Sequence, residues 1–283
     1  MTDFPQSDTL ALEQHSHVLH VTLSRPEARN AMSLAMVAEL STVFSEIEQD
    51  PGIRAVVLRG TGGHFCAGGD IKDMAGARNQ PADAGEPDPF YRLNRAFGEM
   101  IQQVNQSSKV VIAVLEGAVM GGGFGLACVS DLAFAGPTAR FGLPETSLGV
   151  IPAQIAPFVV ERIGLTQTRR LALLGLRLDG AEACQLGLVH QFCNSDESLT
   201  EALQTALDQI RRCAPNATAA TKALLHRVGH EPMGGLLDDA AKQFAHAIRS
   251  DEGAEGTLAF MQKRPPVWAE TDHPEAADPA RGH

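Results

Sequence analysis

Two glycine-rich segments and one glutamate are the residues of this sequence whose types and spacing suit chemistry. The first segment runs from Gly60 to Gly69 and the second from Gly121 to Gly125. Each follows an apolar run typical of a buried strand and precedes a helical pattern, so each presents backbone N–H groups at a helix N-terminus. Two converging N–H groups polarise a carbonyl oxygen, and a carboxylate such as that of Glu145 is a side chain that can move a proton.

Each glycine segment alone has a simpler explanation, because glycine-rich turns between strands and helices are common without any ligand. Neither segment contains G-x-G-x-x-G, and the lysine of a P-loop is absent from both, so we expect neither NAD nor ATP and no other cofactor. His226 and His230 are four residues apart on a predicted helix, but the glutamate of a zinc-binding H-E-x-x-H motif is missing. We therefore expect no metal site.

Apolar patterns predict the elements that hold these loops. Alternation predicts a hairpin over residues 10–23 with its turn at 15–17, and apolar runs predict strands at 54–58, 110–115 and 131–135. Helical spacing predicts helices at 32–48 and 90–105, whereas residues 75–89, rich in Ala, Gly, Pro and Asp, predict a mobile surface loop. The order of strand, glycine loop and helix occurs twice, which indicates an α/β fold in which two similar turns of chain stack.

Beyond about residue 195 the pattern is purely helical. Helices are expected at 199–212, 218–228 and 233–250. We therefore predict a core over residues 1–195, a helical segment over 196–268 and a flexible polar tail over 269–283.

Composition limits the class of protein. The 283 residues are 44% hydrophobic, which suffices for a large core, and the five cysteines are odd in number with no C-x-x-C pair, as expected in a reducing cytosol. Neither a signal peptide nor a membrane-spanning run is evident, so a cytoplasmic location is expected. The net charge of −11 argues against nucleic acid and anionic membranes as partners, but a phosphorylated small ligand is compatible with a local basic cluster.

Four motifs together resemble those of the enoyl-CoA hydratase/isomerase (crotonase) family. They occur in the family's order and spacing, and they are Arg25-Pro26-Glu27-Ala28-Arg29-Asn30-Ala31-Met32, Ala67-Gly68-Gly69-Asp70, Gly121-Gly122-Gly123 and Phe141-Gly142-Leu143-Pro144-Glu145. The resemblance covers residues 10–265. It implies a spiral of repeated ββα units, an acyl-CoA substrate, and a C-terminal helical segment that packs into a trimer, commonly paired into a hexamer.

The resemblance also implies roles for individual residues. The N–H groups of Ala67 and Gly122 are expected to form the oxyanion hole for the thioester oxygen, with Glu145 as the proton carrier. Residues expected at the CoA channel are Ala28, Arg29, Phe65, Gly69 and Asp70, with Arg29, Lys72, Lys263 and Arg264 as candidates for its 3′-phosphate. Asp70 is equally suited to cap the helix that begins at Ile71, and Cys66 is interpreted as a packing residue rather than a nucleophile.

One position departs from the typical hydratase, which uses two glutamates. Glu145 matches one of them, but the position of the other is Gly125. A single carboxylate that moves the proton both ways, a water held by other groups, or an acid on the substrate would each permit hydration. Asp73 and Glu99 are candidates for a second acid. A Δ3-Δ2 isomerase that needs only Glu145, and a scaffold protein without catalysis, are the alternatives.

A further local likeness narrows the substrate. The segments Gly122-Gly123-Phe124-Gly125-Leu126 and Gly149 to Phe158 resemble the subgroup that hydrates methylglutaconyl-CoA and isohexenylglutaconyl-CoA, the latter being favoured. Such esters carry a carboxylate of their own. Loss of one catalytic glutamate would lessen the repulsion between like charges in the pocket.

Overall fold

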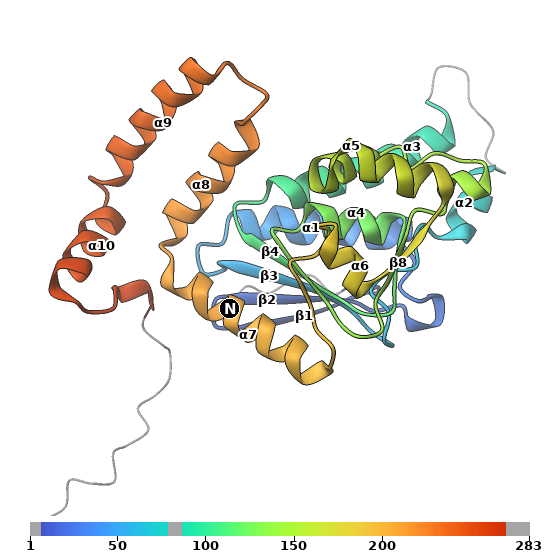
Figure 1. Cartoon of the computed structure of the whole chain (residues 1–283), viewed down its shortest axis with the longest axis horizontal. Coiled ribbons are helices and arrows are strands. Elements are labelled where there is room, and N and C mark those ends of the chain that lie inside the picture. Colours follow the sequence, from blue (N-terminus) through green and yellow to red (C-terminus); the bar gives the residue numbers. More distant parts are fainter. Residues whose placement is uncertain (1–6, 79–86, 270–283) are drawn as a thin grey trace, which may run out of the picture. The chain divides into compact units, whose positions relative to one another are not determined.

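A main sheet of six strands carries the functional loops in the computed structural model, which describes residues 7–78 and 87–269 (Figure 1). Its strand order is β1-β2-β3-β4-β6-β9, and a second sheet has the order β5-β7-β8. The strands are β1 (Leu10–His15), β2 (Val18–Leu23), β3 (Ala55–Gly60), β4 (Val110–Leu115), β5 (Ala118–Met120), β6 (Leu132–Ala135), β7 (Arg140–Gly142), β8 (Arg177–Asp179) and β9 (Gln191–Phe192).

Ten α-helices are found in the described residues. They are α1 (Leu34–Glu48), α2 (Ile71–Arg78), α3 (Pro89–Gln106), α4 (Gly122–Val129), α5 (Ala156–Leu174), α6 (Gly180–Gln185), α7 (Asp196–Arg212), α8 (Pro215–Arg227), α9 (Met233–Ala247) and α10 (Asp251–Gln262). Three 3-10 helices are η1 (Pro26–Ala28), η2 (Glu145–Leu148) and η3 (Val267–Ala269).

The chain builds both sheets by repeating one unit. After β4 it forms β5 in the small sheet and then α4, and after β6 it forms β7 in the small sheet and then α5. The segment after β3 follows the same course, because Cys66 pairs in parallel with Val119 of β5 before α2 begins. The predicted spiral of ββα units is therefore confirmed, with strands that are parallel from β2 to β9.

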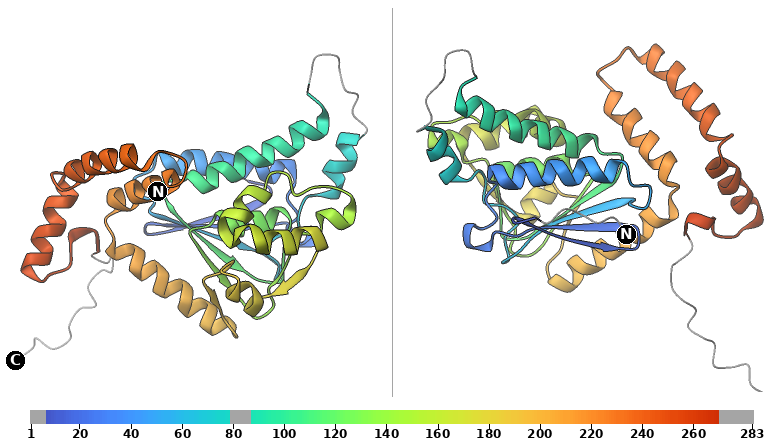
Figure 2. Two further views of the ribbon diagram at one scale, coloured as in Figure 1. Left: turned by 45° about the horizontal axis from the view of Figure 1, so that its top comes forward. Right: turned by 180° about the vertical axis from the view of Figure 1, so that it is seen from behind.

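The burial of each element follows from its sequence. The first four residues of β3 and the last five of β4 are buried, as expected of central parallel strands covered on both faces. Ser33 caps α1 by accepting a hydrogen bond from the N–H of Met36, and the helix buries its apolar stripe toward the core. Helices α1 and α3 lie side by side over one face of the main sheet (Figure 2).

The predicted loop over residues 75–89 is wrong at its beginning and its end. Residues 75–78 belong to α2, and Pro89 is the first residue of α3. Asp88 caps α3 by accepting from the N–H of Phe90 at 2.7 Å, a signal within a polar run that composition alone does not separate from a loop. Residues 79–86, in the middle of the predicted loop, lie outside the described residues.

Contacts divide the chain into two compact units after Ala206, within α7. In the second unit α8 and α9 pack against each other (Figure 1), and Ser250 starts a further helix, α10, by accepting from the N–H of Gly253. The prediction of three helices beyond residue 195 therefore missed α10. Of the predicted tail over 269–283, only Ala269 lies within the described residues. No helix in the described ranges is long and apolar enough to cross a bilayer.

Candidate active site

The two glycine loops run side by side because the first pairs with the small sheet. Phe65 donates its N–H to the carbonyl of Glu116 at 2.8 Å, and Cys66 donates to Ala118 at 2.9 Å. Met120 donates back to the carbonyl of Cys66 at 2.9 Å. The first loop is thereby fixed to β5, which leads directly into the second loop.

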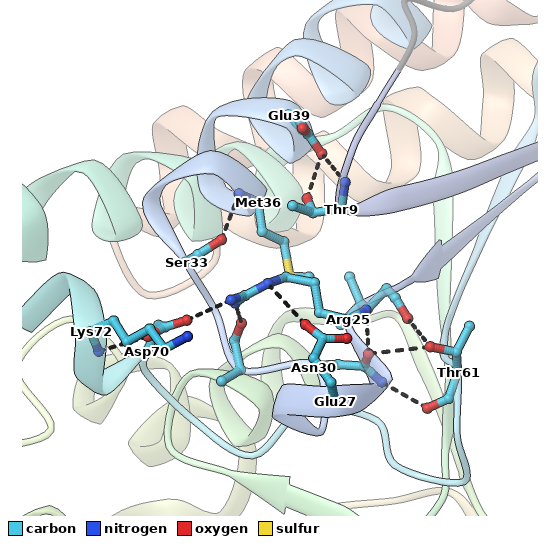
Figure 3. Close-up of polar contacts among 12 residues, drawn as sticks. Thr9, Arg25, Glu27, Asn30, Ser33, Met36, Glu39, Thr61, Asp70 and Lys72 are labelled. Atoms are coloured by element: carbon cyan, nitrogen blue, oxygen red, sulfur yellow. Dashed lines mark hydrogen bonds and ion pairs between the residues drawn. The ribbon is translucent and has the colours of Figure 1, made fainter.

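Charged side chains hold the first loop against the segment before α1 (Figure 3). Asp70 is 8% exposed, and its carboxylate accepts from the Arg25 guanidinium at 2.8 Å and from the N–H of Lys72 at 2.7 Å. Burial acts to raise the pKa of Asp70, but these hydrogen bonds outweigh it and hold the pKa below its usual value. Asp70 is thus a helix cap and an ion-pair partner, and its contact with CoA stays a prediction.

Asn30 ties the same segment to the far end of the loop. It is fully buried, and its amide donates to the carbonyl oxygen of Thr61 at 2.9 Å (Figure 3). The same amide donates to the carbonyl oxygen of His64 at 2.7 Å. Its side-chain oxygen accepts from the N–H of Arg25 at 2.8 Å. The Arg-Pro-Glu-Ala-Arg-Asn motif therefore holds the first glycine loop in position through these hydrogen bonds.

The N–H groups available to a ligand differ from those expected. Ala67 donates its N–H to the carbonyl of Arg29 at 3.0 Å, so this group is already occupied. Among the described residues, no acceptor is found for the N–H of Gly69 or for that of Gly122, the first residue of α4. Gly69, two residues beyond Ala67 in the same loop, thus has an N–H without an acceptor in the described part of the chain, whereas that of Ala67 is engaged. Which of the two binds a thioester oxygen stays a prediction.

Glycine is required where the two loops meet. Gly121 has a φ of +47° and Gly68 a φ of +106°, conformations that residues with a side chain rarely adopt. A Cβ atom on Gly121 would lie 3.0 Å from Oε1 of Glu145 and 3.5 Å from the Cα of Gly68. Both loops and the glutamate therefore converge at Gly121.

Glu145 is the first residue of η2 and lies partly buried beside this meeting point. Its Oε2 atom is buried and has no hydrogen-bond partner within the part of the chain that the structure describes. Burial raises the pKa of the carboxyl above its ordinary value, and a hydrogen bond from its own N–H opposes this only in part. A buried polar atom without a partner is rare, and a bound substrate or water would supply one.

The raised pKa predicts how stability responds to pH. From the ordinary glutamate pKa of about 4.3 up to the raised native value, the folded protein keeps a proton that the unfolded chain has lost. The free energy of unfolding therefore falls as pH rises through this window. Glu145→Gln removes that loss, so we expect it to melt at a higher temperature than the wild type at about pH 8, with the difference shrinking toward about pH 4. Thermal unfolding followed by circular dichroism measures this, and a difference independent of pH contradicts it.

The position of the missing second glutamate is filled by apolar side chains. A Cβ on Gly125 would lie 2.4 Å from Cγ2 of Ile155 and 2.9 Å from Cδ1 of Ile101. Ile101 is fully buried and Ile155 nearly so. The sequence did not identify Ile101 as part of the site, and it indicated Ile155 only within the segment Gly149 to Phe158.

Neither candidate for a second acid replaces that glutamate. Asp73 accepts from the N–H of Leu34 at 2.7 Å, and Glu99 is mostly exposed and pairs with Arg95 at 3.7 Å. Cys66 is fully buried, which raises the pKa of its thiol to about 11, so it is protonated at neutral pH and packs as interpreted.

The residues expected around CoA lie on several elements of both units. Ala28 and Arg29 lie at the end of η1, Arg29 in a left-handed conformation, and Phe65 is buried in the first loop. Lys72 is exposed on α2. Lys263 and Arg264 belong to the second unit, where Lys263 is exposed and Arg264 is engaged by Glu255 at 2.6 Å. Within the described ranges, no group of His, Cys, Asp and Glu is arranged to hold a metal ion.

The fold thus places two glycine loops with unengaged backbone donors beside a partly buried carboxylate, an arrangement that suits the stabilisation of an oxyanion. The family model described as enoyl-CoA hydratase/isomerase matches residues 13–271. The chain belongs to this enoyl-CoA hydratase/isomerase family.

Known proteins resemble it along almost the whole chain. A probable enoyl-CoA hydratase, echA8, of Mycobacterium bovis is 34% identical over 262 residues, which cover 92% of this chain and 98% of that protein. An enoyl-CoA hydratase/isomerase structure from Marinobacter aquaeolei is 74% identical with a TM-score of 0.91, over 93% of this chain and 100% of that one. Pseudomonas aeruginosa AtuE is 58% identical with a TM-score of 0.89, again over 93% and 100%.

Proposed function

We propose that this enzyme adds water across the double bond of a branched glutaconyl-CoA ester, with isohexenylglutaconyl-CoA favoured over 3-methylglutaconyl-CoA. The observation that carries the proposal is the closed position at Gly125, where Ile101 and Ile155 take the space of a second carboxylate. A site with one acid suits a substrate that carries its own negative charge, because repulsion between like charges is reduced. The likeness of the Gly122–Leu126 and Gly149–Phe158 segments to the glutaconyl subgroup supports the same choice.

In the proposed mechanism, the thioester oxygen accepts hydrogen bonds from the N–H groups of Gly69 and Gly122. Water attacks the β-carbon while Glu145 accepts a proton from it, and the electron pair of the double bond moves onto the thioester oxygen as an enolate. The Glu145 carboxyl then returns a proton to the α-carbon on the same face. The product is a 3-hydroxyacyl-CoA, and the carboxylate ends in its starting state.

Burial of Glu145 suits this double role. A carboxyl whose pKa is raised toward neutrality is a stronger base than a solvated one and still releases its proton readily. The unpartnered Oε2 atom has no competing donor among the described residues.

A panel of CoA esters tests the reaction and its substrate. The purified protein is given crotonyl-CoA, 3-methylglutaconyl-CoA, isohexenylglutaconyl-CoA and a 3-enoyl-CoA, and the absorbance of the conjugated thioester is followed. We expect rapid loss of absorbance with the glutaconyl esters and at least about tenfold lower kcat/KM with crotonyl-CoA, as the loss of a charged contact predicts. Equal rates with neutral and glutaconyl esters contradict the substrate, and gain of absorbance with the 3-enoyl ester alone identifies a double-bond isomerase.

We further propose that the chain assembles as a trimer or as a hexamer made of two trimers. Large apolar side chains on the helices of the second unit face solvent in the single chain: Phe260 is 85% and Phe244 69% exposed. Soluble monomers rarely expose such patches. Light scattering after gel filtration is expected to give three or six times the chain mass, and Phe260→Asp to lower it, whereas a monomeric wild type contradicts the proposal.

A further inference from the structure

One arginine lies beside Gln154, the residue that precedes one of the two isoleucines at the Gly125 position. Arg95 is on α3, and its guanidinium approaches the side chain of Gln154, with Nη1 3.5 Å from Oε1. Gln154 directly precedes Ile155, and Phe97 of the same helix α3 lies 3.1 Å from the point where a Cβ on Gly122 would stand. The α3 segment from Arg95 to Ile101 therefore flanks both the oxyanion loop and the closed position at Gly125.

Gln154 and Asn94 fix the surroundings of this guanidinium. The Gln154 amide donates to Oδ1 of Asn94 at 2.9 Å, which directs its Oε1 toward Arg95. Gly98 makes room for this arrangement, because a Cβ there would lie 1.9 Å from the Gln154 oxygen and 2.7 Å from Nη1 of Arg95. Any larger residue at position 98 would displace the pair.

The guanidinium of Arg95 has a more distant acidic partner than those of two other arginines, Arg25 and Arg264. Its acidic neighbour, Glu99, lies 3.7 Å from Nε, and the side chain of Arg95 is 38% exposed. By contrast, the ion pairs of Arg25 with Asp70 and of Arg264 with Glu255 measure 2.8 and 2.6 Å. Arginine presents five donors in a fork that fits a carboxylate in a bidentate manner, so Arg95 retains donors for a further anion.

We propose that Arg95, oriented by Gln154, binds the carboxylate of the acyl group and so sets the preference for glutaconyl esters. This inference rests on the function proposed above and names the residue that would select its substrate. The positive charge also offsets the repulsion between the substrate carboxylate and Glu145.

The test compares two esters that differ only in the carboxylate, 3-methylglutaconyl-CoA and 3-methylcrotonyl-CoA. We expect Arg95→Leu to lower kcat/KM for the glutaconyl ester on the order of 10- to 100-fold, mostly through KM, and to change that for the neutral ester less than about threefold. Arg95→Lys should recover part of the loss, since it keeps the charge without the fork. Arg169→Leu, at an exposed arginine on α5, is the matched control and should change neither value.

The outcomes separate this inference from the proposed function. If the wild type turns over both esters equally, the proposed function fails and the carboxylate role of Arg95 fails with it. If the wild type prefers the glutaconyl ester and Arg95→Leu keeps that preference, only the role of Arg95 is overturned. An equal loss on both esters in a variant with unchanged thermal unfolding also overturns it, because such a loss points to the CoA phosphates or to helix packing.

Discussion

Replacement of Glu145 by glutamine is expected to lower kcat for hydration by about 10²–10⁴, the range found for removal of a positioned general base. Glutamine keeps the shape of the side chain but cannot accept and return a proton. The effect should be near the upper end, because the described residues offer no second carboxylate at the Gly125 position. Steady-state rates with a glutaconyl ester measure the loss.

The control for this variant is Glu161→Gln, an exposed glutamate on α5 that undergoes the same chemical change. It should keep the wild-type rate. Nearly full activity of the Glu145→Gln protein would show that Glu145 does not carry the proton. If the Glu145→Gln protein does not fold, the activity of a folded Glu145→Ala protein is measured in its place.

Gly121→Ala should reduce kcat/KM by about 10²–10³, as loss of an oxyanion donor does in other enzymes. Gly121 has φ +47° and ψ −114°, which strains any residue with a Cβ by about 1–3 kcal/mol. The new methyl group would also press on Oε1 of Glu145 at 3.0 Å and on the Gly68 loop. The Glu145 carboxylate and the N–H groups of the two loops would therefore both be displaced from their present positions.

Gly234→Ala provides the matched control, because a Cβ at this position of α9 meets no atom within 4 Å. It should leave activity unchanged and stabilise the helix by up to about 1 kcal/mol, the difference in helix propensity between glycine and alanine. Equal activity of the Gly121→Ala protein and the wild type would show that the meeting of the two loops does not position the reacting groups.

Much of the core was predictable from periodicity. The hairpin, the strand at 110–115 and the helix that buries Met36 to Ile47 have the predicted places, because each buries a continuous or regularly spaced apolar face. The short strands of the small sheet, such as β7 and β8, were not predicted. Three-residue strands carry too few residues to show alternation, and they exist because neighbouring segments pair with them.

The sequence predicted the types of residue in the candidate site. It did not predict which of their polar atoms already have hydrogen-bond partners. Motifs located both loops and Glu145, but hydrogen bonding decides which N–H is available, and Ala67 gives its own to Arg29. Sequence also did not reveal that Asp70 is committed to Arg25, since the two residues are brought together only by the fold. Spacing identifies a loop, whereas the partners of each group depend on distant segments.

The packing around Gly125 limits which substitutions the protein tolerates at this position. A glutamate introduced there alone would meet Ile155 and Ile101 at less than contact distance, and such overpacking typically costs about 1–3 kcal/mol before the burial of its charge is counted. A glutamate at position 125 therefore requires smaller residues at positions 101 and 155 first, and those changes alone would leave a cavity. The packing of the two isoleucines thus disfavours any single substitution that would place a second acid at this position.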